Sequence, residues 1–189
     1  MKLKHVGILA GTVLWVGGCF LNPEDDDNGN RVTESQKYIV ATTSLVDQAG
    51  NVALISTDDF SASTDLLSIH PDNAVMTNGS STYILERYGK DNLLRIDGPD
   101  ISADSLKYQV KIGTAVNIHE IACVSESKAY VTQYGSTECA IIDPRTGEVT
   151  GSISLSAAKF RSDGEDVPYM SSIIVIDDNA YIALQRLKV

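Results

Sequence analysis

Two stretches of the chain repeat each other, and their spacing constrains the fold more than any other feature. Ser81–Gly89 and Lys128–Gly135 each hold an apolar run that contains a tyrosine near its start and closes with Tyr-Gly. An Ile-Asp pair follows both copies at the same distance, and its two aspartates, Asp97 and Asp143, are 46 residues apart. A third copy opens at Asn179–Leu184. A period of this length predicts a repeat architecture, in which each repeat is one supersecondary unit.

Short apolar stretches separated by turn residues fill the chain after Tyr38, and such stretches predict β-strands. The predicted strands are Tyr38–Thr43, Asn51–Ser56, Ala74–Thr77, Thr82–Arg87, Asn92–Ile96, Leu106–Ile112, Glu120–Val124, Ala129–Gln133, Cys139–Ile142, Val149–Leu155, Ile173–Ile176 and Ala180–Gln185. A helical period is visible only weakly, at Leu155–Arg161. About four strands for each repeat period predict an all-β fold: a partial β-propeller of about three to four blades of four antiparallel strands, at residues 37–189.

Several motifs resemble those of a known repeat family. The segments that carry this resemblance are Ala129–Gly135, Ile141–Pro144 and Thr146–Val149, and they resemble the YVTN-type β-propeller repeat. Tyr88–Leu93, Asn117–Glu120 and Ala183–Leu187 resemble segments of uncharacterised propeller lipoproteins of Gram-negative bacteria. The resemblance spans residues 74–187. It implies the fold, and it carries no activity over to this chain.

The number of repeats is smaller than a closed propeller needs, because such rings have 4–8 blades. The chain stops at Val189, just after a predicted inner strand. An unfinished ring would leave strand edges open for pairing. We therefore expect the chain to be an N-terminal part of a longer propeller. The alternatives are an oligomer that completes the ring and an open stack of blades.

The N-terminus has the features of a bacterial lipoprotein signal. A basic start at Lys2 and Lys4 precedes a short apolar run and the small residues before Cys19. We expect residues 1–18 to be the signal peptide and Cys19 to carry the lipid after cleavage. The alternative is an ordinary signal peptide with an incidental cysteine. Phe20 in place of an aspartate implies, by analogy with enterobacterial lipoproteins, sorting to the outer membrane, at its periplasmic face or at the cell surface.

Residues 19–36 form an acidic tether in this prediction. Glu24–Asp27 are four consecutive acids beside proline and glycine, which is typical of a solvated spacer. A calcium site and a surface-export signal are the alternatives. The whole chain has 15 Lys+Arg and 25 Asp+Glu, and loss of two leader lysines takes its formal net charge from −10 to −12. This acidic balance excludes a typical nucleic-acid-binding protein.

Three residues are candidates for a binding site. His119 comes just before a predicted inner strand, at the rim of the expected central funnel, and Asp72 and Met170 are its counterparts in the neighbouring repeats. Glu120 could pair with His119 as an acid/base couple. The alternative is that His119 only caps a turn. Since His, Asp and Met make no symmetric ligand ring, we predict no metal site here.

Two other features bear on chemistry. The longer spacing before the third copy predicts an inserted loop around residues 160–168, and Asp163, Glu165 and Asp166 in this loop could bind calcium, with a solvated turn as the alternative. Cys123 and Cys139 fall in the first and third strands of one blade. Strands two places apart are separated by about 9.6 Å, beyond the roughly 7 Å reach of a disulfide. We therefore expect two free, buried thiols and no other cofactor.

The function predicted from these features is a lipoprotein of the bacterial cell envelope that presents a non-catalytic propeller surface for binding. Its partners would be the membrane, through Cys19, and an unidentified protein, glycan or small ligand. One alternative is an envelope hydrolase or lyase with its site in the funnel. The other is a truncated propeller without function of its own.

Overall fold

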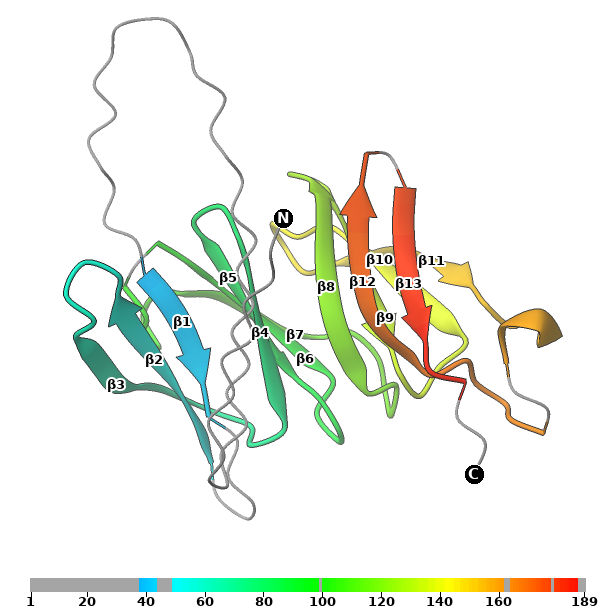
Figure 1. The fold of residues 1–189 in the computed structure, drawn as a ribbon, viewed down its shortest axis with the longest axis horizontal. Helices are drawn as coiled ribbons and strands as arrows, with labels where there is room; N and C mark the ends of the chain where they lie inside the picture. The colour runs from blue at the N-terminus through cyan, green and yellow to red at the C-terminus, as the bar shows by residue number, and fades with distance from the viewer. Residues whose placement is uncertain (1–37, 44–48, 99, 162–163, 178, 187–189) are drawn as a thin grey trace, which may run out of the picture.

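The chain folds into four antiparallel β-sheets that follow one another in sequence order (Figure 1). The structure is a computed structural model, and it describes residues 38–43, 49–98, 100–161, 164–177 and 179–186. The predicted leader and acidic tether, including Cys19, lie outside the described residues. Among the described residues the only helical element is one short 3₁₀ turn, η1 (Ala158–Phe160). The all-β prediction is therefore confirmed.

Each sheet is a meander, because strands adjacent in the chain are also hydrogen-bonded neighbours. The first sheet is β1 (Tyr38–Thr42), β2 (Gly50–Ser56) and β3 (Ala62–Ile69). The second is β4 (Asn73–Asn78), β5 (Ser81–Glu86), β6 (Asn92–Asp97) and β7 (Leu106–Lys111). The third is β8 (Ile118–Ser125), β9 (Lys128–Gln133), β10 (Glu138–Ile142) and β11 (Val149–Ser154), and the fourth is β12 (Met170–Ile176) with β13 (Asn179–Leu184). Within the described part of the chain no sheet closes on itself.

Every stretch that the sequence predicts as a strand lies in or overlaps one of these strands. Only β3 has no counterpart among the predicted strands. Its first four residues, Ala62–Asp65, are all exposed, and Asp65 has a left-handed φ of 58°. An edge strand that buries so little lacks the apolar alternation from which strands are predicted.

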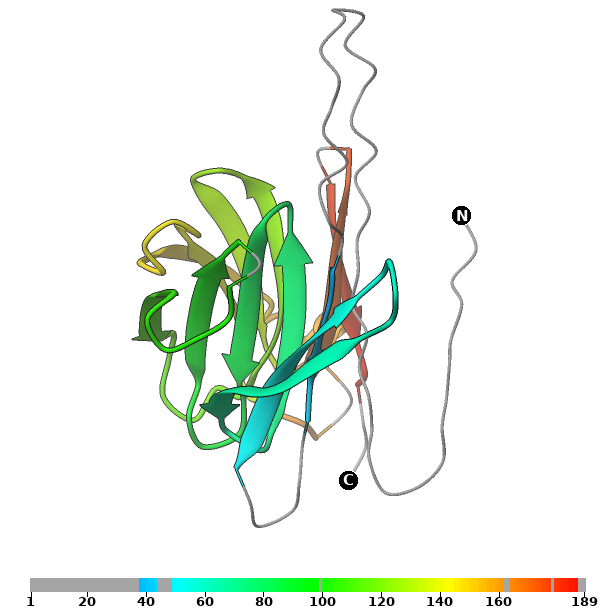
Figure 2. The same cartoon turned by 90° about the vertical axis from the view of Figure 1, so that its left-hand side faces the viewer.

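Three hydrophobic clusters lie between consecutive sheets. In β5, Ile84 belongs to the cluster shared with the first sheet, whereas its neighbour Leu85 belongs to the cluster shared with the third. Leu94 and Leu93 of β6 divide in the same way. Successive side chains of a strand point to opposite faces, so the second sheet is covered on both sides. This explains why its middle strands are continuous apolar runs rather than alternating ones. In Figure 2 the first sheet lies in front of the second.

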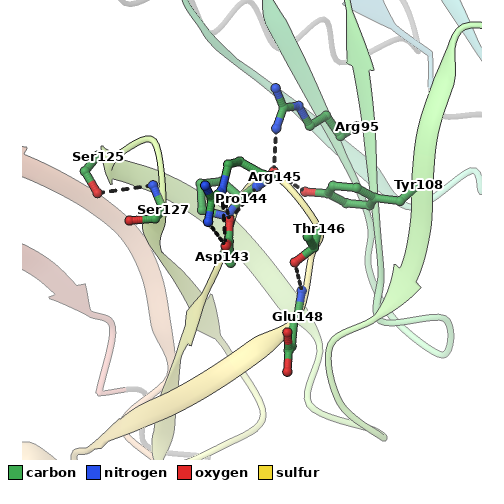
Figure 3. A network of polar contacts seen from close by, with 9 residues as sticks. All are labelled: Arg95, Tyr108, Ser125, Ser127, Asp143, Pro144, Arg145, Thr146 and Glu148. Atoms are coloured by element: carbon green, nitrogen blue, oxygen red, sulfur yellow. Dashed lines mark hydrogen bonds and ion pairs between the residues drawn. The ribbon is translucent and has the colours of Figure 1, made fainter.

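A turn of the third sheet docks onto the second sheet through hydrogen bonds to one carbonyl (Figure 3). Arg95 Nη1 of β6 and the Tyr108 hydroxyl of β7 each donate to the carbonyl oxygen of Pro144, both at 2.9 Å. Arg95 is held in place by Asp97, which accepts from its Nε at 2.7 Å. The Asp-Pro-Arg-Thr-Gly sequence of the turn ends at Gly147, whose φ of 76° favours glycine. The turn thus fixes the third sheet against the second.

The third and fourth sheets are joined by polar groups near the start of β12. The Thr132 hydroxyl of β9 donates to the carbonyl oxygen of Ser171 at 3.0 Å. The backbone N–H of Ile173 donates to Glu120 Oε2 at 2.9 Å. Thr132 has no exposed surface, whereas Glu120 is half-buried, so the contact is partly shielded from water. In Figure 1, β8 and β12 stand side by side at this contact.

Replacement of Gly147 with alanine tests the docking of this turn. A Cβ there would overlap Val110 Cγ2 and lie 2.9 Å from Tyr108 Cε2. We expect Gly147→Ala to lower the free energy of unfolding by about 2–4 kcal/mol, from backbone strain together with overpacking. Urea denaturation followed by far-UV circular dichroism measures this loss.

Gly79→Ala is the matched control. Gly79 also has a positive φ, 58°, but a Cβ there meets no atom within 4 Å. Backbone strain alone should cost about 1 kcal/mol. Equal losses for the two variants would contradict the docking of the turn against β7.

Candidate functional site

A group of aromatic and charged side chains lies at one end of the second, third and fourth sheets. We define the rim cluster as Asp72, Arg87, Tyr88, His119, Tyr134 and Tyr169. They occupy the starts of the first strands of these sheets and the turns that follow the second strands. Antiparallel pairing brings these positions to the same edge, as Asn73 opposite Glu86 and Ile118 opposite Gln133 illustrate.

Aromatic rings form the centre of the rim cluster. His119 and Tyr134 are stacked, with ring centroids 4.6 Å apart and planes inclined by 16°. The Tyr169 ring also contacts Tyr134, with ring centroids 5.2 Å apart and planes inclined by 50°. The Tyr134 hydroxyl is 2.8 Å from Oε1 of Gln185, to which it donates. Rings from the third sheet and the segment before β12 are thus linked through Tyr134.

Asp72 is held by the turn after β5. Arg87 Nε donates to Asp72 Oδ1 at 2.8 Å, and the backbone N–H of Tyr88 donates to Oδ2 at 3.2 Å. The ion pair is half-buried. Tyr88 itself is 74% exposed. This turn therefore offers a fixed ion pair beside a free aromatic face.

His119 is uncharged at neutral pH. Burial is the main cause that lowers the pKa of His119 to about 4, and the positive charge of Arg87 lowers it further. Asp72 acts in the opposite direction but does not reverse the shift. A neutral imidazole has one N–H donor and one acceptor nitrogen. The ring can therefore make hydrogen bonds of both kinds without carrying charge.

Glu120 has a different set of partners from His119. Its carboxylate accepts from the backbone of Ile173 and from the Ser172 side chain, both in β12. Burial raises the pKa of Glu120, and these hydrogen bonds only partly offset that effect. Since His119 stacks on Tyr134 instead, the structure does not bring the predicted acid/base couple together. A binding role for Glu120 stays a prediction.

The aromatic part of the rim cluster was only partly visible in the sequence. The repeated Tyr-Gly pairs indicate Tyr88 and Tyr134. The predicted strand positions do not show which side chains their rings contact. Met170, the predicted counterpart of His119, has no exposed surface and packs in the cluster between the third and fourth sheets. Its neighbour Tyr169, with a left-handed φ of 56°, lies at the rim instead. No sequence signal indicates that conformation.

The predicted calcium loop is described only in part. Asp163 lies outside the described residues. Glu165 Oε2 accepts from the Tyr169 hydroxyl at 2.7 Å, and the Asp166 carbonyl accepts from Arg161 Nη1 at 3.3 Å. Among the residues that the structure describes, no three His, Cys, Asp or Glu side chains form a group suited to a metal ion. The calcium site stays a prediction.

The two described cysteines are free, as predicted. Cys139 is buried, and its thiol donates to the Val131 carbonyl at 3.4 Å. Burial raises the pKa of Cys139 to about 11. Cys123 is only half-buried, and burial also raises its pKa. Thiols whose pKa is raised are poor nucleophiles at neutral pH, so neither cysteine is suited to covalent catalysis.

In comparisons with known proteins, no family model and no curated protein matches the chain. In the described ranges no helix is both long and apolar enough to cross a membrane.

The stacked histidine predicts a pH dependence of stability. The unfolded chain holds this imidazole near its ordinary pKa of 6.5, whereas the folded chain holds it near 4. Between these values the unfolded state binds the extra proton, so stability falls as the pH drops from 6.5 to 4 and this contribution is constant below 4. Nuclear magnetic resonance titration of the imidazole in the full chain measures its pKa directly.

A His119→Phe variant is the control, because a phenyl ring can keep the stacking contact and does not titrate. Its stability should lose the part of the pH dependence that lies between 6.5 and 4. A midpoint near 6.5 for His119 in the folded chain would contradict its burial beside Arg87.

Proposed function

We propose that this protein is a lipid-anchored, non-catalytic binding protein of the bacterial cell envelope. In this proposal its sheets are blades of a β-propeller and the rim cluster recognises a glycan. The blade assignment is supported by the packing of first strands, since β4 packs against β1 and β8, and β8 packs against β12. First strands that pack side by side are what a propeller requires around its axis.

The anchoring part of the proposal rests on the sequence of residues 1–36. A basic start, a short apolar run and Cys19 support lipidation, and the acidic segment after it would space the sheets from the membrane. Sorting to the outer membrane rests on Phe20, by analogy with enterobacterial lipoproteins.

The single observation that carries the binding role is the group of aromatic rings beside a fixed ion pair. His119, Tyr134 and Tyr169 are in ring contact, and the exposed ring of Tyr88 follows Arg87 directly. Aromatic side chains offer apolar faces with polar tips. Such faces suit the C–H surfaces of sugar rings, while the ion pair and the neutral imidazole offer hydrogen bonds to hydroxyl groups. The cluster contains no activated nucleophile, which favours binding over hydrolysis.

A glycan array probed with the full chain in detergent tests the proposal. We expect selective binding of neutral envelope-type oligosaccharides, and at least a tenfold loss in Tyr88→Ala. Because Tyr88 is mostly exposed, this variant should fold normally. Tyr181→Ala is the control, since Tyr181 is 56% exposed, lies on β13 and is outside the rim cluster. No binding by the unaltered chain, or equal losses in both variants, would contradict the proposal. Cleavage of a bound glycan would indicate the alternative, an enzyme.

A further inference from the structure

A cavity of about 490 Å³, widely open to solvent, lies between the first and second sheets. Its wall includes Ser68 and His70 at the end of β3, Glu86, Lys90 and Asn92 around the β5–β6 turn, and Gln109 of β7. No member of the rim cluster lines it. The volume falls within the range of small-molecule sites, about 300–1,000 Å³.

The wall of this cavity contains a buried carboxylate in a fixed orientation. Glu86 is only 7% exposed. Its Oε1 accepts from the His70 backbone N–H at 2.8 Å, and its Oε2 accepts from Asn92 Nδ2 at 2.7 Å and Gln109 Nε2 at 3.1 Å. All three donors are neutral groups. Among the described residues the ion pairs involve other acids, so this carboxylate has no cationic partner there.

The repeat indicates that the fold itself does not need this charge. Glu86 is the last residue of β5, and Gln133 is the last residue of β9 in the next sheet. Gln133 is buried to the same degree, at 6% exposure, and it is neutral. A buried carboxylate without a cation costs free energy that a buried amide does not. We therefore relate the negative charge of Glu86 to the cavity rather than to the stability of the sheet.

We propose that this cavity binds a small zwitterion, an amino acid or short peptide, with its ammonium group on Glu86 and its carboxylate on Lys90. An ammonium has three N–H donors, and the Glu86 carboxylate, which lines this wall, is an acceptor with a full negative charge. Lys90 is exposed and supplies the positive charge. A simple cation would be repelled by Lys90 and a simple anion by Glu86, so a ligand with both charges is complementary.

Titration calorimetry of the full chain in detergent with glycylglycine tests this site. We expect the dipeptide to bind, and glycinamide and N-acetylglycine, which each lack one charge, to bind at least tenfold more weakly. Glu86→Gln should weaken dipeptide binding at least tenfold, whereas Glu138→Gln, the same change on β10 of the third sheet, should not. The far-UV circular dichroism of each variant checks that it is folded.

Lys90→Gln is a second test if Glu86→Gln fails to fold. Because Lys90 is exposed, we expect this variant to fold normally. This variant should also lose at least tenfold in dipeptide affinity. The proposal is overturned if the unaltered chain does not bind glycylglycine at millimolar concentration, if glycinamide binds equally well, or if Lys90→Gln binds like the unaltered chain. Tyr88→Ala should leave dipeptide binding unchanged, which separates this site from the rim cluster.

Discussion

The burial of both faces of the middle strands is the constraint on which the rest of the structure depends. One face of β5 and β6 packs toward the first sheet and the other toward the third. A single meander of four short strands could not bury both faces by itself. Each middle sheet therefore needs its neighbours to bury its two apolar faces.

Polar contacts then fix how neighbouring sheets lie against each other. Arg95 and Tyr108 hold the turn at Pro144 on one side of the third sheet, and Glu120 and Thr132 hold β12 on the other. Apolar packing is not directional, whereas hydrogen bonds are. The rim cluster depends on these directional contacts between sheets, because its rings come from different sheets. Glu120 is one of the residues that join the sheets, and a binding role for it stays a prediction.

Much of the fold could be predicted from the sequence, because strands and turns are encoded locally. The apolar run of β5 and the Asp-Pro-Arg-Thr-Gly turn are visible without a structure. What could not be predicted depends on contacts between sheets. Glu86 looks like any polar residue at a strand end, and the sequence does not indicate that it is buried beside the His70 backbone N–H, which follows the first sheet. His119 was found from the repeat, but its stacking partner Tyr134 and the neighbouring Tyr169 depend on how the loops meet.

Native-state hydrogen exchange of the full chain tests most directly whether consecutive sheets share their cores. If they do, the slowest amides of β4–β6 and of β8–β10 exchange through one common opening, with the same free energy and the same dependence on denaturant. The exposed strands β11 and β13 exchange faster. Clearly different opening free energies for the second and third sheets would contradict the account, because each sheet would then be stable without the other.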